Sequence, residues 1–254
     1  MGAGHAHPLH LPGVSPVHRL APQVKVLVAF LFVCCVVATP REAFWAFGAY
    51  FLLLCAVWAV AAIPPRWIAA RSLIEAPFLV LAVLLPFAEG GERVEVAGLS
   101  LSVAGMLAGW NIIIKGTLGV LTSLTLAATT APRDLLLGLQ RLRVPGTVTT
   151  IATLMLRYID VIVGEARRMR VARISRGHDP RLLWQAGATA RGVGSLFLRS
   201  YERGERVHLA MLARGWMGAM PTMVDVPAPR REWVAGLALV AAALVISIAS
   251  RWWV

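Results

Sequence analysis

The sequence carries one six-residue pattern twice, and its residue types are suited to binding a carboxylate. Both copies read Ala-x-x-x-Arg-Gly, at 172–177 and 210–215, 38 positions apart. In an α-helix the Ala and the Arg lie one turn apart on one face, and the Gly favours the end of the helix. The helix dipole stabilises an arginine in the last turn, whose planar guanidinium presents a rigid set of donors. The repeat therefore predicts two helix ends that could bind a carboxylate or a backbone groove, although helix capping alone would also account for it.

Histidines are concentrated at the start of the chain, where they could hold a transition metal. Four of the six lie in the first 18 residues: His5, His7, His10 and His18. Imidazole suits cobalt, nickel, copper and zinc. Irregular spacing and intervening prolines prevent a helix that would align these ligands. We therefore expect no defined metal site and leave transient binding open.

Motifs for nucleotide binding and catalysis are absent from the sequence. The stretch 109–115 lacks the Gly before its Lys, and the Ser or Thr after it, that a phosphate-binding loop requires. The chain contains neither His-Glu-x-x-His nor Gly-x-Ser-x-Gly. We expect a non-catalytic protein with no cofactor in this chain.

Composition places the chain in a membrane. Hydrophobic residues make up 58% and charged residues 15%, and the mean hydropathy is +0.70. A soluble domain carries about 25% charged residues, so this chain has too little polar surface to cover a water-exposed fold. The formal charge of +12 is explained by Lys and Arg gathering in cytoplasmic loops, and no nucleic acid is expected as a partner. The cysteines, at 34, 35 and 55, lie in apolar runs and indicate neither disulfides nor a thiolate metal site.

Five apolar runs predict transmembrane helices, because a hydrocarbon layer of about 30 Å needs about 20 residues. They lie at 24–39, 42–63, 72–88, 101–130 and 233–250, and Lys115-Gly116 is expected to interrupt the fourth. Basic residues before the first run place the N-terminus inside. The acidic loop 89–100 belongs outside, and its alternation around 97–98 predicts a small β-hairpin. The C-terminus is then outside.

Most of the excess charge lies between 133 and 214, which holds 15 Arg and 6 acidic residues. Apolar residues recur there with helical spacing after Pro145. These helices would lie against anionic headgroups, or form a docking platform, or both. The part at 147–163 could itself be buried in the membrane, with Arg157 and Asp160 neutralising each other. The expected organisation is a His/Pro-rich cytoplasmic tail (1–23), transmembrane helices (24–131), Arg-rich cytoplasmic helices (132–231) and a C-terminal transmembrane helix (232–254).

Three segments resemble the transmembrane T components of energy-coupling factor (ECF) transporters. Residues 205–216, Glu-Arg-Val-His-Leu-Ala-Met-Leu-Ala-Arg-Gly-Trp, resemble the second signature of that family. Residues 170–177 resemble the first, with Ser175 where the family usually has Ala. Residues 16–25 resemble the entry to the first span in the CbiQ branch, with Ala21 where an Asp is more usual. The resemblance covers essentially the whole chain.

The resemblance implies a coupling subunit. It would join two cytoplasmic ABC-type ATPase subunits, which bind ATP and Mg²⁺, to a CbiM/CbiN-like membrane subunit that captures the substrate. Arg176 and Arg214 would each anchor one ATPase, and their small neighbours would allow close approach. The implied docking residues are Ala172, Ser175, Arg176, Gly177, Ala210, Ala213, Arg214 and Gly215.

The resemblance also implies a substrate and a location. The substrate would be cobalt, with nickel or a vitamin as the alternative. The protein would be an all-α, multi-pass protein of a bacterial inner membrane, with five transmembrane helices and a cytoplasmic or interfacial helical coupling domain. A stand-alone secondary transporter would instead need inverted repeats and broken helices at mid-membrane. A membrane metalloenzyme would need His or acidic ligands within its spans.

Overall fold

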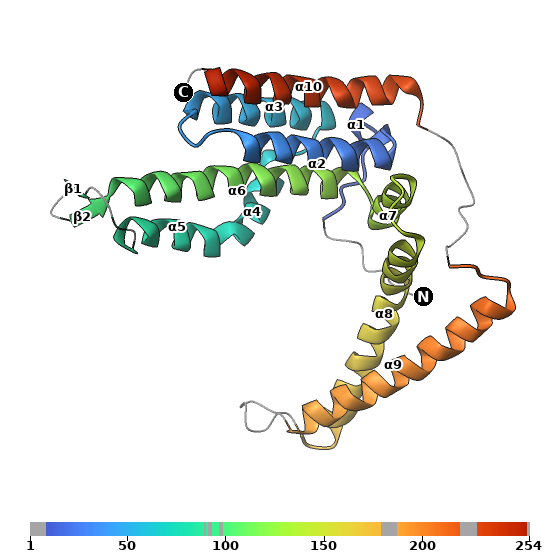
Figure 1. Cartoon of the computed structure of the whole chain (residues 1–254). Coiled ribbons are helices and arrows are strands. Elements are labelled where there is room, and N and C mark those ends of the chain that lie inside the picture. Colours follow the sequence, from blue (N-terminus) through green and yellow to red (C-terminus); the bar gives the residue numbers. More distant parts are fainter. Residues whose placement is uncertain are drawn as a thin grey trace. The chain divides into compact units, whose positions relative to one another are not determined.

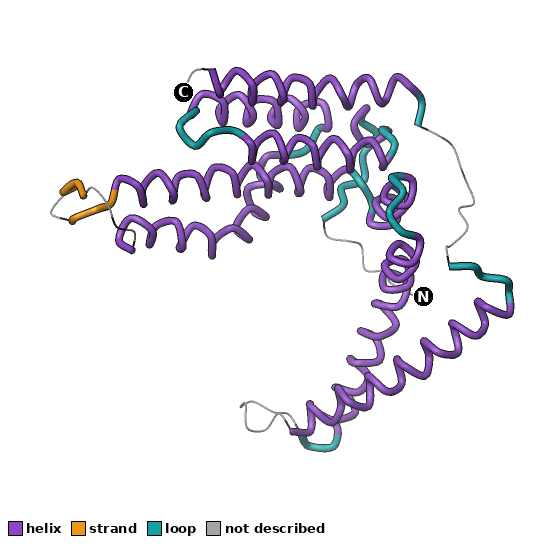
Figure 2. The backbone as a smooth tube through the Cα atoms, in the orientation of Figure 1, coloured by secondary structure: helices purple, strands orange, loops and turns teal. Residues whose placement is uncertain are grey.

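The computed structural model describes residues 9–88, 90, 93–96, 99–178, 187–218 and 228–252 (Figure 1). The chain forms two compact units. The larger comprises His7–Gly138 and Val226–Val254, and the smaller is built on Leu139–Asp225. The predicted metal-binding candidates His5 and His7 lie outside the described residues. Figure 2 shows that both units are built mainly of helices.

The elements of the larger unit follow the apolar runs and their prolines. Pro at the first turn begins several helices, because its fixed φ suits that position and its missing N–H is not needed there. In chain order the elements are α1 (Pro16–Arg19), α2 (Pro22–Ala38), α3 (Phe44–Ala61), α4 (Pro65–Ser72), the 3₁₀ turn η1 (Leu73–Glu75), α5 (Ala76–Ala88), β1 (Arg93–Val96), β2 (Leu99–Ser102), α6 (Val103–Thr129), α7 (Pro132–Arg141) and α10 (Arg230–Trp252).

The core of the larger unit lies where α2, α3, α6 and α10 pack together. Its largest fully buried side chains include Tyr50, Phe32 and Phe47. The rings of Phe32 and Tyr50 meet edge to face, with centroids 5.6 Å apart. The Tyr50 hydroxyl lies 3.0 Å from Thr39 Oγ1 and donates to the Ala243 carbonyl at 3.2 Å. A buried tyrosine thus satisfies its polar atom, as burial requires.

Five helical segments are long and apolar enough to cross a membrane: 44–61, 65–88, 103–129, 146–175 and 230–252. The predicted first span is the 17-residue α2, a shorter apolar helix beside them. On α5, large hydrophobic side chains such as Phe78, Val80 and Val83 are exposed. Lipid is the solvent that such a surface requires. The all-α integral membrane fold is thereby confirmed.

The expected break in the fourth span is wrong, because α6 runs without interruption through Lys115 and Gly116. Both residues have partners on neighbouring helices. The Lys115 ammonium donates to the Val37 carbonyl at the end of α2, at 2.9 Å. A Cβ on Gly116 would lie 2.7 Å from Oε1 of the buried Glu75, so the glycine makes room for that carboxyl group. Thr117 Oγ1 donates to the same oxygen at 3.1 Å.

The predicted hairpin is confirmed in its strands. β1 and β2 pair antiparallel, with Arg93 opposite Ser102 and Val96 opposite Leu99. The turn residues 97–98 lie outside the described part. In Figure 1 the hairpin joins α5 to α6, which lie side by side. Their close approach depends on glycines: a Cβ on Gly109 would lie 2.6 Å from the Ala82 carbonyl oxygen.

The N-terminal segment is held against the larger unit by hydrogen bonds. The Leu11 N–H donates to the Ala128 carbonyl at 3.0 Å. The His18 imidazole lies 2.7 Å from Ser15 Oγ through Nδ1 and 3.2 Å from the Leu11 carbonyl through Nε2. The Lys25 ammonium donates to the His18 carbonyl at 3.0 Å. Burial lowers the pKa of His18 below its ordinary value, and the positive charge of Lys25 acts in the same direction.

Candidate functional site: two helix ends

The first candidate docking end closes α8, which spans Gly146–Ser175. Arg176 follows as the C-cap, and Gly177 adopts a φ of +77°. The Gly177 N–H donates to the Ile174 carbonyl at 2.9 Å, and the His178 N–H donates to the Arg173 carbonyl at 3.2 Å. This pair of bonds defines a Schellman motif, in which glycine occupies the left-handed position. The predicted glycine stop is confirmed.

The second candidate end closes α9, which spans Gly187–Ala213, and repeats the first bond for bond. Gly215 has a φ of +78°. The Gly215 N–H donates to the Leu212 carbonyl at 2.9 Å, and the Trp216 N–H donates to the Met211 carbonyl at 3.0 Å. Arg214 therefore occupies the position that Arg176 occupies on α8. The sequence repeat corresponds to a repeated local structure.

Both arginines are available to a partner. All eight predicted docking residues are exposed: Ala172, Ser175, Arg176, Gly177, Ala210, Ala213, Arg214 and Gly215. No ion pair or side-chain hydrogen bond joins the guanidinium of Arg176 or Arg214 to any described residue. An exposed guanidinium next to the carbonyl end of a helix is well placed to bind a carboxylate.

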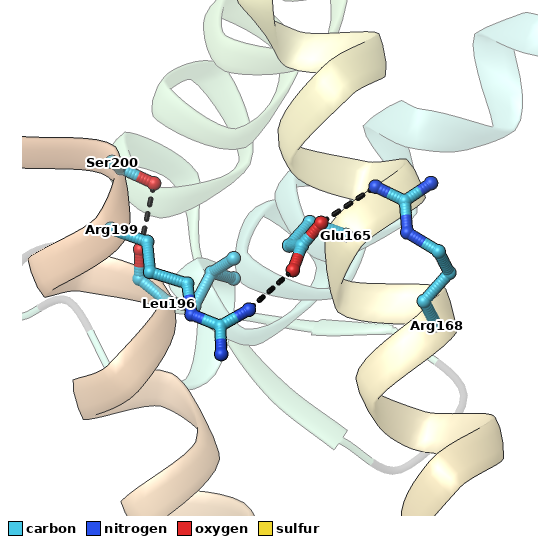
Figure 3. Close-up of polar contacts among 5 residues, drawn as sticks. All are labelled: Glu165, Arg168, Leu196, Arg199 and Ser200. Carbon is cyan, nitrogen blue, oxygen red and sulfur yellow. Dashed lines mark hydrogen bonds and ion pairs between the residues drawn. The ribbon is translucent and has the colours of Figure 1, made fainter. Parts of the chain in front are cut away.

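Another arginine of the same unit, Arg199, joins the two helices through Glu165. Glu165 on α8 accepts from Arg168 at 2.6 Å and from Arg199 of α9 at 2.8 Å (Figure 3). Nearer the end of α8, Arg173 and Met169 lie beside Gly192 of α9. Residues later in α8 thus lie beside residues earlier in α9. The two helices run antiparallel, and their docking ends lie at opposite ends of the pair.

Sequence reasoning missed the residues that follow the two glycines. His178 Nε2 and Trp216 Nε1 are both buried, with no hydrogen-bond partner among the described residues. The Trp216 ring meets His208 edge to face, with centroids 5.9 Å apart. The signal was present, because the position after the glycine in a Schellman motif commonly packs back on its own helix.

Two hollows lie between the first half of α8 and the second half of α9. One, of about 390 Å³, is lined by apolar side chains together with Thr147, Thr150, Ser200, Arg203 and His208. The other, of about 800 Å³, includes three predicted docking residues among its walls: Ala210, Arg214 and Gly215. The second docking end therefore borders a concave surface.

The described residues contain no cluster of three or more His, Cys, Asp or Glu side chains that could hold a metal ion. Of the two described N-terminal histidines, His18 has both ring nitrogens within hydrogen-bond distance of Ser15 and Leu11. His10 lies in the same segment. The free cysteines Cys34, Cys35 and Cys55 are on α2 and α3.

The structure combines a bundle of apolar helices with a helix pair in which an exposed arginine follows each helix, and it defines an integral membrane protein. The family model described as "Cobalt transport protein" (CbiQ) matches residues 13–225. The chain belongs to this family, which comprises CbiQ-like T components of ECF transporters.

Curated relatives agree with that assignment. The chain is 30% identical over 169 residues to the cobalt transport protein CbiQ of Rhodobacter capsulatus, covering 66% of this chain and 67% of the relative. It is 28% identical over 223 residues to the energy-coupling factor transporter transmembrane protein EcfT of Bacillus selenitireducens, covering 82% of each. A putative fused cobalt transport protein CbiMQ of Methanocorpusculum labreanum is 26% identical over 224 residues, covering 81% of this chain and 36% of the relative.

Proposed function

We propose that this T component is a non-catalytic coupling subunit that connects two cytoplasmic ABC-type ATPases to a substrate-capture membrane subunit. The observation that carries the proposal is the pair of matching Schellman ends, each with an exposed arginine free of described partners. Two matching ends suit two copies of one partner surface, as a two-fold ATPase pair would offer. ATP and Mg²⁺ are bound by those partners, and ATP-driven closure moves the two helix ends.

The ATPases require the helix pair to face the cytoplasm, in a bacterial inner membrane. The charge distribution supports that orientation, because Lys and Arg accumulate on the cytoplasmic side. The stretch 133–214 carries 15 Arg against 6 acidic residues. The N-terminus lies on the same side in this proposal. The opposite side then contains the loop between α5 and α6.

Cobalt is the proposed substrate, captured by a CbiM/CbiN-like subunit. Support comes from the family description and from relatives whose names include cobalt transport. The fused CbiMQ relative supports a CbiM-like partner, because fusion keeps two interacting parts in one chain. Uptake of radioactive cobalt, competed with nickel, tests the choice of metal. Stronger competition by nickel than by unlabelled cobalt would reassign the substrate.

Charge reversal of both helix ends tests the coupling role. Arg176→Glu, Arg214→Glu and the double variant are co-purified from membranes with the neighbouring ATPase and capture subunits. We expect each reversal to weaken ATPase binding and the double to abolish both binding and cobalt uptake, since a carboxylate in the partner would then face a carboxylate. Arg167→Glu, an exposed arginine of α8 away from both ends, is the matched control. If the folded double variant binds the ATPases and takes up cobalt as well as the wild type does, the repeat serves only to cap the two helices.

A further inference from the structure

The hollow at the end of α9 has walls from both helices of the smaller unit. On α9, Val207, Ala210 and Arg214 line it with a spacing of three and four residues, so they share one helix face. On α8, Leu154 and Tyr158 do the same, one turn apart. The lining includes two arginines, two aromatic residues and two small residues: Arg157, Arg214, Tyr158, Trp216, Ala210 and Gly215.

The charges around this hollow have one sign. Arg157 and Arg214 both line it, and no Asp or Glu is among its lining residues. The Arg157 guanidinium lies 5.9 Å from the ring centroid of the neighbouring Tyr158. No carboxylate among the described residues forms an ion pair with it. Two guanidinium groups beside one concavity repel each other unless an anion lies between them.

Two further features of the lining indicate a proteinaceous anion. Ala210 and Gly215 contribute little or no side chain to the lining, so a partner backbone can approach. Tyr158 and Trp216 add flat aromatic walls, which are enriched at protein interfaces. A lipid headgroup is more commonly bound by long cationic side chains that extend from an open surface.

We propose that Arg157 and Arg214 together bind one carboxylate side chain of the ATPase, so that the end of α9 is a two-arginine clamp. This inference rests on the proposed coupling function and adds Arg157, from the other helix, to that docking end. Because the two arginines come from different helices, a bound carboxylate also ties α8 to α9. The clamp thereby transmits movement of the ATPase to both helices.

Binding of the purified ATPase to the membrane subunit in zwitterionic nanodiscs tests the clamp. We expect Arg157→Gln to weaken binding about tenfold, because a charge-assisted hydrogen bond is lost. The ATPase affinity of Arg157→Lys should lie between those of Arg157→Gln and the wild type, because lysine keeps the charge and loses the planar donor pair. Arg167→Gln, an exposed arginine of the same helix outside the hollow, is the control and should change nothing. Equal effects of Arg157→Gln and Arg167→Gln would overturn the proposal.

A double-variant cycle shows whether the two arginines share one carboxylate. With Arg157→Gln and Arg214→Gln combined, the loss should be smaller than the product of the two single losses. If the loss of affinity in the double variant equals the product of the two single losses, the proposal that both arginines bind one carboxylate is wrong. Unchanged ATPase binding, with weaker binding of Arg157→Gln to anionic vesicles, would assign the hollow to lipid.

The outcome also separates this proposal from the coupling role. If the double reversal at Arg176 and Arg214 abolishes ATPase binding while Arg157→Gln has no effect, the clamp alone is wrong. If the double reversal leaves binding intact, the coupling function itself fails.

Discussion

Replacing Gly215 by Ala isolates the backbone contribution to the α9 docking end. The residue has a φ of +78°, and a Cβ there would have nothing within 4 Å. The substitution therefore adds no steric contact, and its only cost is the left-handed conformation, about 1–2 kcal/mol for an L-residue with a Cβ. That cost falls on the turn that places Arg214 and Trp216. It favours fraying of the end over the ordered motif.

The expected consequence is weaker ATPase binding. A penalty of about 1–2 kcal/mol bounds the loss of affinity at roughly 5- to 30-fold, when the frayed end does not bind. Gly215→Asn should lose less affinity for the ATPase than Gly215→Ala, because Asn adopts left-handed conformations more readily than Ala. The assay is ATPase affinity together with hydrogen exchange of the amides at the end of α9. Faster exchange at these amides should accompany the loss.

Gly194→Ala is the matched control. Gly194 lies within α9, a Cβ there also meets nothing within 4 Å, and its φ is not positive. This substitution should stabilise the helix by about 0.5–1 kcal/mol and leave the docking end unchanged. The reasoning is refuted if Gly215→Ala binds the ATPase as well as Gly194→Ala does. It is also refuted if Gly215→Asn binds less tightly than Gly215→Ala.

Three further results are expected. Gly109→Ala should destabilise the larger unit by about 1–3 kcal/mol in thermal unfolding, because its Cβ would collide with the α5 backbone. Gly119→Ala, where a Cβ meets nothing within 4 Å, should be neutral or stabilising. Glu165→Gln should lower thermal stability slightly at low salt and not at high salt, whereas Glu202→Gln should not, since among the described residues only Glu165 bridges two arginines. Because the pKa of His18 is lowered in the folded protein, its contribution to holding the N-terminal segment is full above the ordinary value of 6.5 and is lost as pH falls toward the folded value. After correction for the intrinsic slowing of exchange in acid, the amide protection factors of residues 9–20 should therefore fall at acidic pH in the wild type, and His18→Gln should remove that dependence on pH.

The docking ends were predictable because their determinants are local. A helix ends where glycine can take a positive φ, and both Gly177 and Gly215 do so. The arginine before each glycine is placed by the same few residues. Hydropathy likewise locates the apolar helices without reference to their neighbours. Whether these ends dock ATPases stays a prediction.

The partners of single residues across the fold were not predictable. Lys115 suggested a broken helix because nothing in its own segment indicates the carbonyl of Val37, which comes from α2. The role of Gly116 depends on Glu75, which lies on another element. The hollow lined by Arg157 and Arg214 is formed by residues of both α8 and the end of α9, so it depends on how the two helices pack. Such facts depend on tertiary packing, and a single sequence does not encode them in any local pattern.

The lengths of two neighbouring helices place opposite demands on the bilayer. α2 has 17 residues, about 25 Å, which is shorter than a hydrocarbon layer of about 30 Å. α6, which packs against it, has 27 residues, about 40 Å. At the short helix's end, Lys115 and Arg251 donate to the carbonyls of Val37 and Ala38, so long cationic side chains bind backbone groups that lie in the last turn of the helix. No single membrane thickness matches both helices. The acyl-chain length of the surrounding lipids, which sets the thickness of the hydrocarbon layer, should therefore influence how the helices of this bundle pack.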